Sequence, residues 1–441
     1  MHAPAPHSPD NAQDSAPDTM IRPDFGEAFR FWLKLGFLSF GGVAGQLALM
    51  QHELVDRRRW VAQRPFLNAL NFCMLLPGPE AQQLATYLGW KLHGVRGGLA
   101  AGLLFILPGA AILLALSWLA AAHGDVGWVG ALFDGVKPVV LGIVAAAIWR
   151  MGRKTLTGWP ALALAVGAFI GLRLAGVPFP LLILAAGLVG VTAIALGRDP
   201  FGVKTAAPGD LPPLPARGFV RLAGLVALFA VLWAVPVLGV FAWLGTDPYG
   251  DVAELFTTAA FVTFGGAYAV LPYIADAGVN TYGWLTTAEM VKGLALAEST
   301  PGPTILVLQF VGFFAGWTNP GAVSPLLAGT VASLLALYVT FLPSFLFIFA
   351  GGPYVERIIA NRYAAAALAA ITAAVVGVIL NLGVFLGTAI ILPAPGVIAW
   401  DAVILALLSL AALIRFGVQV HWLVLAGAAI GLARAAVMGG L

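Results

Sequence analysis

The sequence contains few charged residues. Lys, Arg, Asp and Glu make up 10% of its 441 residues, whereas hydrophobic residues make up 60%. A soluble protein of this length exposes more charge than that, because most of its surface faces water. The composition therefore predicts a polytopic membrane protein whose partner is the lipid bilayer.

Cysteine and the common catalytic and cofactor motifs are also scarce. The single cysteine, Cys73, excludes an internal disulfide and a cysteine-based metal cluster. The six histidines form no His-Glu-x-x-His pattern, and no G-x-x-x-x-G-K-[ST] loop is present, which argues against a metalloprotease and against direct use of ATP. The sequence contains no nucleophile–base pattern that would indicate an enzyme and no basic stripe that would indicate nucleic-acid binding. No cofactor is expected.

Proline and glycine, in contrast, are placed in a repeating pattern. Pro77-Gly78-Pro79 recurs as Pro301-Gly302-Pro303, and each follows a Phe-Gly-Gly, at 40–42 and at 264–266. The offset is 224 residues in both cases. Proline and glycine break helices, and in lipid such a break persists only where its backbone faces protein, water or a ligand. The sequence therefore indicates an internal repeat, in which the chain consists of two copies of one structural unit.

The repeat divides the chain into four parts. Residues 1–23 are polar and rich in Pro, Ala and Asp, which predicts a disordered cytoplasmic tail. We expect the first copy at 24–197, a linker with one additional transmembrane helix at 198–245, and the second copy at 246–441.

Basic residues predict how the copies are oriented. Residues 22–64 contain seven Lys or Arg, and the equivalent window 246–288 contains none. Since basic residues stay in the cytoplasm, the copies are expected to have opposite orientations in the cell inner (plasma) membrane. The same rule favours two re-entrant hairpins followed by four spans in each copy, with bent spans as the alternative. It also assigns a cytoplasmic loop to Arg150, Arg153 and Lys154. The predicted fold class is an all-α polytopic membrane protein with two inverted-topology repeats joined by one extra transmembrane helix.

Three segments carry a family resemblance. FLSFGGVAGQLALMQHELVDRRRWV, LNFCMLLPGPEAQQLATYLGWKLHG and LAESTPGPTILVLQFVGFFAG resemble the signature segments of the chromate ion transporter (CHR) family in its long two-domain form. The resemblance covers roughly residues 25–435. It implies proton-gradient-driven export of an oxyanion, chromate in the best-known members, and hence chromate resistance. Transport of sulfate or another oxyanion, a passive anion channel and a homodimer are left open.

The helix breaks are the predicted oxyanion site. A helix that starts at a break presents unpaired N–H groups and partial positive charge, which suit a tetrahedral dianion. The alternative is that these breaks only allow kinks and close packing. The predicted substrate-binding residues are Gly41, Gly42, Pro77, Gly78, Pro79, Gln82, Gln83, Gly265, Gly266, Ser299, Thr300, Pro301, Gly302, Pro303 and Thr304.

Two carboxylates and three arginines complete the predicted site. Glu80 and Glu298 lie beside breaks in apolar runs, where an unpaired carboxylate is costly, so they are the predicted carriers of protons exchanged against the anion. Glu80 could instead complement the positive end of its helix. Arg57, Arg58 and Arg59 are the predicted cytoplasmic anion funnel, with a role in topology alone as the alternative.

Overall fold

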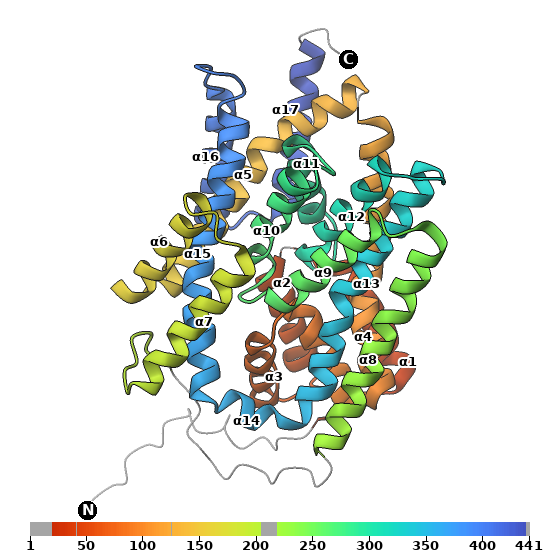
Figure 1. The fold of residues 1–441 in the computed structure, drawn as a ribbon, viewed down its shortest axis with the longest axis vertical. Coiled ribbons are helices and arrows are strands. Elements are labelled where there is room, and N and C mark those ends of the chain that lie inside the picture. Colours follow the sequence, from red (N-terminus) through yellow and green to blue (C-terminus); the bar gives the residue numbers. More distant parts are fainter. Residues whose placement is uncertain (1–19, 41, 125, 204–217, 438–441) are drawn as a thin grey trace, which may run out of the picture.

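The computed structural model describes residues 20–40, 42–124, 126–203 and 218–437. Every regular element among them is helical, apart from one isolated bridge between Ala394 and Val397. The all-α prediction is therefore confirmed. Figure 1 shows the helices as an elongated bundle in which the long helices run mainly along the vertical axis.

The helices follow the two copies and the connecting segment. In the first copy they are α1 Phe25–Leu38, α2 Gly42–Gln51, the π-helix His52–Arg57, α3 Gln63–Leu75, α4 Glu80–His123, α5 Gly127–Thr155, α6 Trp159–Arg173 and α7 Phe179–Ala195. The connecting helix is α8 Gly218–Leu244. In the second copy they are α9 Tyr249–Val262, η3 Ala267–Ala269, α10 Leu271–Asp276, the π-helix Ala277–Thr281, α11 Thr287–Ser299, η5 Thr304–Leu306, α12 Val307–Thr318, α13 Pro325–Gly351, η6 Gly352–Tyr354, α14 Val355–Ile359, α15 Arg362–Ile391, α16 Trp400–Arg415 and α17 Val420–Val437.

The first helices of the two copies have matching bounds. Adding 224 to the bounds of α1 and α3 gives the bounds of α9 and α11. In Figure 1, α3 lies in the lower half of the molecule and α11 in the upper half. The equivalent helices thus occupy opposite halves, while their orientation in a bilayer stays a prediction.

The chain reverses direction at the Pro-Gly-Pro breaks. The rings of Phe72 in α3 and Tyr87 in α4 are 5.6 Å apart, although a continuous helix would separate these residues by about 22 Å. In the second copy, a Cβ on Gly293 of α11 would lie 2.4 Å from the ring of Phe310 in α12. Each break therefore joins two helices that pack against each other, while the choice between re-entrant hairpins and bent spans in a bilayer stays a prediction.

Helix α4 contains a second reversal. Its residues His93 and Gly94 have non-helical dihedral angles, and Gly94 has φ +64°. Glycines bring the two arms into contact: a Cβ on Gly97 would lie 2.3 Å from the carbonyl oxygen of Gly89. The first arm of α4 thus completes the hairpin, and the second arm continues as a long apolar helix.

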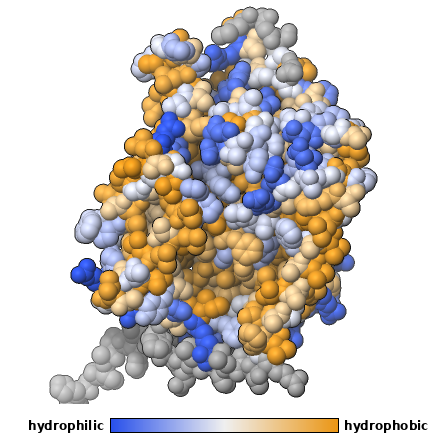
Figure 2. Space-filling view, viewed as in Figure 1, coloured by the Kyte–Doolittle hydropathy of each residue, from blue (hydrophilic) through white to orange (hydrophobic). Residues whose placement is uncertain are grey.

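Six helical segments of the described chain are long and apolar enough to cross a membrane, namely α4, α5, α8, α13–α14, α15 and α17. Helices α6 and α7 are apolar but have only 15 and 17 residues. Figure 2 shows apolar residues over most of the lateral surface in this view, with polar residues gathered toward the upper part. This distribution is that of a polytopic membrane protein.

Candidate functional site: a charged cavity where the two copies meet

The breaks of one copy bind the breaks of the other through backbone hydrogen bonds. The N–H of Gly78 donates to the carbonyl of Thr263 at 2.8 Å, and the N–H of Gly302 donates to the carbonyl of Ser39 at 2.9 Å. Since Gly302 and Thr263 lie 224 residues after Gly78 and Ser39, the second bond is the repeat equivalent of the first. Each Pro-Gly-Pro therefore packs on the residue before the opposite Phe-Gly-Gly.

Glycine is required at these junctions for its backbone conformation. Gly78 has φ +117° and Gly302 has φ +101°, values that other residues rarely adopt. Gln46 strengthens the second junction, because its Nε2 donates to the carbonyl of Gly302 at 2.6 Å. The N–H groups of both glycines are thus already bonded within the protein.

A cavity of about 360 Å³ lies beside these junctions. Four of its lining residues come from each copy at equivalent repeat positions. The first copy contributes Gly42, Val43, Ala44 and Met74, and the second contributes Gly266, Ala267, Tyr268 and Glu298. Helices α5, α15, α16 and α17 supply other parts of the wall. The cavity is therefore formed jointly by the two copies.

Four charged side chains line the cavity. Glu80 begins α4 and Glu298 lies one residue before the end of α11, and these side chains are only 8% and 6% exposed. Arg150 and Lys154 lie four residues apart on α5, so they share one face of that helix. Both cations are near the C-terminal end of α5, where the helix dipole favours positive charge.

One carboxylate of the cavity accepts a hydrogen bond from a neighbouring side chain. The hydroxyl of Tyr268 donates to Oε1 of Glu298 at 2.6 Å. Glu80, Lys154, Arg150 and Tyr268 all line this same cavity. Arg150 also donates to the carbonyl of Leu413 at 2.8 Å, which fixes its guanidinium against α16. Among the described residues, no cluster of three or more His, Cys, Asp or Glu side chains could hold a metal ion.

Only part of the predicted site lines this cavity. The members that do are Gly42, Gly265, Gly266, Glu80 and Glu298. The members that do not are Pro77, Gly78, Pro79, Gln82, Gln83, Ser299, Thr300, Pro301, Gly302, Pro303 and Thr304. Gly41 lies outside the described residues. A substrate-binding role for the whole set stays a prediction.

Several polar groups at the breaks are used within the protein. The hydroxyls of Ser299 and Thr300 donate to carbonyls of their own helix, at 3.0 Å and 3.1 Å. Gln82 donates to Thr86 at 3.0 Å, and Gln83 donates to the carbonyl of Pro77 at 2.6 Å. These bonds stabilise the breaks, as the packing interpretation expects.

The sequence analysis did not predict three residues that line the cavity: Arg150, Lys154 and Tyr268. Arg150, Arg153 and Lys154 were expected in a loop, but they belong to the last turns of α5, and this expectation was wrong. Arg150 and Lys154 could have been recognised as site residues, because they form a basic pair four residues apart at the end of an apolar helix. A single Tyr in an apolar run gives no such signal.

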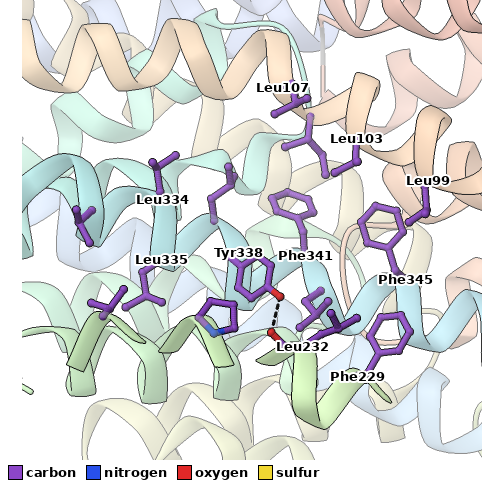
Figure 3. A pocket seen from close by; sticks show the side chains of 16 residues that line it. Leu99, Leu103, Leu107, Phe229, Leu232, Leu334, Leu335, Tyr338, Phe341 and Phe345 are labelled. Atoms are coloured by element: carbon purple, nitrogen blue, oxygen red, sulfur yellow. Dashed lines mark hydrogen bonds between the residues drawn. The ribbon is translucent and has the colours of Figure 1, made fainter. Parts of the chain in front are cut away.

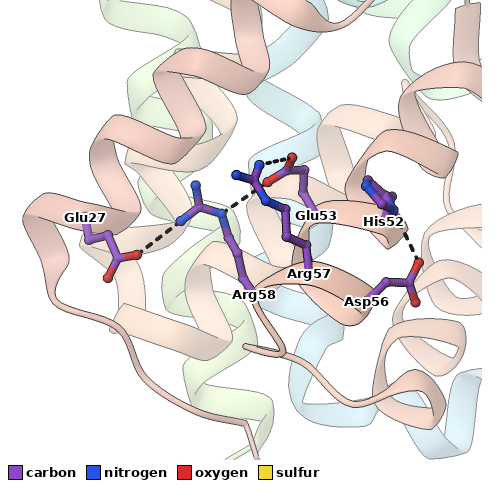
Figure 4. A network of polar contacts seen from close by, with 6 residues as sticks. All are labelled: Glu27, His52, Glu53, Asp56, Arg57 and Arg58. Carbon is purple, nitrogen blue, oxygen red and sulfur yellow. Dashed lines mark hydrogen bonds and ion pairs between the residues drawn. The ribbon is translucent and has the colours of Figure 1, made fainter.

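The arginines of the predicted funnel belong to an ion-pair network (Figure 4). Arg57 contacts Glu53 at 2.8 Å, while Arg58 contacts Glu53 at 3.2 Å and Glu27 at 3.1 Å. Burial alone would raise the pKa of Glu53, but its hydrogen bonds with the two arginines outweigh this effect and hold the pKa below its ordinary value. Arg57 and Arg58 therefore have a structural role; anion attraction by Arg57, Arg58 and Arg59 stays a prediction.

A second and larger cavity, of about 560 Å³, lies between α4, α8 and α13 (Figure 3). Apolar side chains make up nearly all of its lining, and its Tyr338 hydroxyl donates to the carbonyl of Leu232 at 2.5 Å. None of its lining residues is charged. A dianion would lose its hydration there without compensation, so this cavity is unsuited to an oxyanion.

Hairpins with broken helices that meet around a charged cavity, within an apolar helical bundle, define the class of membrane transporters. The chain belongs to the chromate transporter family, whose profile matches residues 26–191 and 250–432. The family and its curated relatives are transporters, not enzymes.

Curated relatives match most of the chain. A chromate transport protein of Pseudomonas aeruginosa is 32% identical over 381 residues, which cover 85% of this chain and 84% of that protein. A chromate transport protein of Cupriavidus metallidurans is 27% identical over 426 residues, 97% of each chain. The uncharacterized transporter YwrB of Bacillus subtilis is 30% identical over 175 residues, 39% of this chain but 85% of its own length. No solved structure matches this chain significantly.

Proposed function

We propose that this protein exports chromate, or a tetrahedral dianion of the same kind, from the cytoplasm across the cell inner membrane. Export draws on the proton gradient and confers resistance to chromate. The observation that carries the proposal is the cavity between the copies, which is lined by Arg150, Lys154 and two buried carboxylates. The family membership and the names of the curated relatives support chromate as a substrate.

The cavity has the charge and the volume that a tetrahedral dianion needs. Arg150 and Lys154 together carry two positive charges, which offset the charge of a dianion in a region of low dielectric constant. Arginine also provides several N–H donors in a planar fork that suits oxyanions. At about 30 Å³ for each water, the 360 Å³ cavity would hold about a dozen waters, so an oxyanion fits with part of its hydration shell.

The carboxylates provide the groups for proton coupling. Glu80 and Glu298 are buried, and both line the cavity that contains the cations. Ionisable groups within the membrane region of a transporter commonly serve the transported ion or the proton. Proton coupling therefore needs no group outside the cavity. Since the protons enter down their gradient while the anion leaves, the coupling takes the form of exchange.

The test is transport by matched variants in inverted membrane vesicles. Arg150→Gln and Lys154→Gln should each weaken the affinity for chromate about 10- to 100-fold, the value of one charge-assisted hydrogen bond. Arg153→Gln is the control, because Arg153 lies in the same turns of α5 but stacks over Trp149 and does not line the cavity. Equal losses in all three variants would contradict the assignment of this cavity.

The same vesicles separate the alternative functions. Chromate and sulfate are compared with and without an imposed proton gradient, which tests specificity and drive. Counterflow of labelled against unlabelled anion distinguishes a carrier from a passive anion channel, since a channel does not exchange one anion against another. Uptake without counterflow would favour the channel.

A further inference from the structure

A polar cavity of about 380 Å³ lies between the end of α6, the start of α7, α10 with the π-helix that follows it, and α15. We call it the α6–α10 cavity. It is about as large as the charged cavity between the copies, so a tetrahedral oxyanion fits here also. The polar side chains of its lining are those of Arg173, Tyr273, Asp276, Asn280, Thr281 and Asn381.

The two cavities follow each other along α15. Leu368, Thr372 and Ile379 line the charged cavity, and Asn381, Leu382 and Phe385 line the α6–α10 cavity. Ile379 and Leu382 are only about 4.5 Å apart along the helix axis. The segment before α11 is arranged in the same way, with residues 266–268 on the charged cavity and residues 272, 273 and 276 on the α6–α10 cavity. About one helical turn therefore separates the two cavities.

The α6–α10 cavity lies toward the side of the molecule opposite to Lys154. Lys154 ends α5 just before the start of α6, whereas Arg173 is the last residue of α6, about 22 Å further along that helix. Figure 1 shows α15 running from α14 at the lower end toward α16 at the upper end, so the α6–α10 cavity is the upper of the two. Asn280 and Thr281 are the repeat equivalents of Asp56 and Arg57. With the predicted opposite orientations of the copies, this cavity faces the outer side of the membrane.

Two side chains of the cavity have polar groups available to a ligand. Among the described residues, Arg173 has no ion-pair partner. The Oδ1 of Asn381 is buried without a hydrogen-bond partner. Since buried polar groups are nearly always paired, such an amide beside a cavity indicates a bound water or ligand. A guanidinium and an amide N–H₂ group are donors that suit an oxyanion.

Asp276 makes this cavity a weaker anion site than its arginine alone would be. Its Oδ1 accepts a hydrogen bond from Nδ2 of Asn280 at 2.8 Å, but its negative charge still opposes a dianion. Weak binding is what release requires, because a tightly held anion would leave slowly.

We propose that the α6–α10 cavity is a second oxyanion site, from which the dianion leaves to the outer side of the membrane, and that Arg173 and Asn381 bind it there. The inference rests on the proposed function and supplies the release end of its path. The anion passes from the charged cavity, across the turn of α15 between Ile379 and Leu382, into the α6–α10 cavity.

The test is protection of a single cysteine by the anion. In a Cys73→Ser background, Thr281→Cys places a thiol on the cavity, and Ala288→Cys places an exposed thiol on α11 outside it as the control. An uncharged impermeant maleimide is applied to right-side-out membrane vesicles. Sulfate is the probe, because chromate oxidises thiols, and gluconate keeps the ionic strength constant. Sulfate should slow labelling at position 281 by the factor 1 + [sulfate]/Kd, about tenfold at ten times Kd, and should not affect position 288.

Further variants in the Thr281→Cys protein identify the binding residues. Arg173→Gln should abolish the protection, whereas Arg173→Lys, which keeps the charge, should retain part of it. Asn381→Ala should raise Kd about tenfold, the value of one hydrogen bond to a charged group. Arg150→Gln should keep the protection, which excludes an indirect effect through the charged cavity. Thermal unfolding verifies that each variant is folded.

The outcomes separate this inference from the proposed function. The inference is overturned if sulfate does not protect position 281, if it protects both positions equally, or if protection survives in folded Arg173→Gln. Labelling of position 281 only in inverted vesicles would overturn it as well, because the cavity would then open to the cytoplasm. These results leave transport through the charged cavity intact. Absence of chromate and sulfate transport by the parent protein would instead overturn the proposed function.

Discussion

The two copies share a backbone plan but differ in the chemistry that they bring to the cavity. At equivalent positions the first copy has Ala44 and Met74, whereas the second has Tyr268 and Glu298. The helix bounds and the positive φ angles at the breaks recur in both copies. The repeat thus supplies a symmetrical frame, and a few substitutions within it make an asymmetric site. Coupled transport needs such an asymmetry, although divergence of the copies alone would also create one.

A second contrast lies where the π-helix of each copy ends. In the first copy the guanidinium of Arg58 lies 4.8 Å from the ring of Trp60. In the second copy Tyr282 stacks on Trp284, with ring centres 4.4 Å apart. A planar group therefore covers the same tryptophan in both copies, but only the first copy uses a charged one. This difference fits opposite membrane sides, because basic residues are kept in the cytoplasm.

The largest expected effect comes from a test of whether the two copies have opposite orientations in the membrane. In a Cys73→Ser background, single cysteines replace Arg59 and its repeat equivalent Gly283, which are both exposed. An impermeant thiol reagent applied to intact cells should label position 283 and not position 59. Permeabilised cells are the control and should be labelled at both positions. Labelling of both positions from outside would show that the copies have the same orientation, and labelling of position 59 alone would reverse the assignment of the sides.

The second largest effect is expected at the two backbone junctions, where Gly78 bonds to Thr263 and Gly302 bonds to Ser39. Gly78→Val and Gly302→Val should abolish transport, since both positions have positive φ and a branched residue there is strained by on the order of 1–3 kcal/mol. Gly78→Val should also lower the amount of protein in the membrane, because its Cβ would lie 2.7 Å from Nε2 of Gln83 and 2.8 Å from the hydroxyl of Ser344. At Gly302 the nearest atom is the Leu306 Cδ1 at 3.1 Å.

The control for the junctions is Gly167→Val in α6, where an added Cβ meets no atom within 4 Å. Chromate uptake is measured at matched protein levels in the membrane. Near-normal uptake by the two junction variants would mean that the breaks serve packing alone and that the cavity does not depend on them.

Local signals were sufficient to predict the breaks. Proline and glycine act within a few residues, so the starts of α4 at Glu80 and of η5 at Thr304 follow from the sequence. The re-entrant form of the hairpins stays a prediction from the basic residues at both of their ends, which favour the same side of the membrane. The preference of Ser299 and Thr300 for their own helix was also foreseeable.

The cavity itself could not be predicted, because it depends on contacts between distant segments. Arg150 lies 70 residues after Glu80 and 148 before Glu298, and no periodicity connects these three positions. The bonds of Gly78 and Gly302 likewise cross from one copy to the other, so neither copy alone reveals that these N–H groups are occupied. The acidic partners of Arg57 and Arg58 were visible as Glu27 and Glu53, but their pairing requires the fold.

The smallest expected effect is the loss of stability on removing either tryptophan contact, Arg58 on Trp60 or Tyr282 on Trp284. Arg58→Ala removes two partly exposed ion pairs and the cation–π contacts with Phe31 and Trp60, and it should lower the free energy of unfolding by about 1 kcal/mol. Tyr282→Ala removes an aromatic pair of about the same value. The two losses should nevertheless depend differently on pH, which thermal unfolding of the two variants and the parent protein measures.

The difference in pH dependence follows from Glu53. Because the folded protein holds the pKa of Glu53 below its ordinary value, the stabilisation from this carboxylate is present above the pKa of the unfolded chain and is lost as the pH falls through the lower pKa of the folded state. The destabilisation caused by Arg58→Ala should therefore shrink on acidification through that range. The effect of Tyr282→Ala should stay constant there, since its stacking on Trp284 involves no carboxylate. Equal pH dependence of the two variants would mean that Arg58 acts mainly by covering Trp60, as Tyr282 covers Trp284.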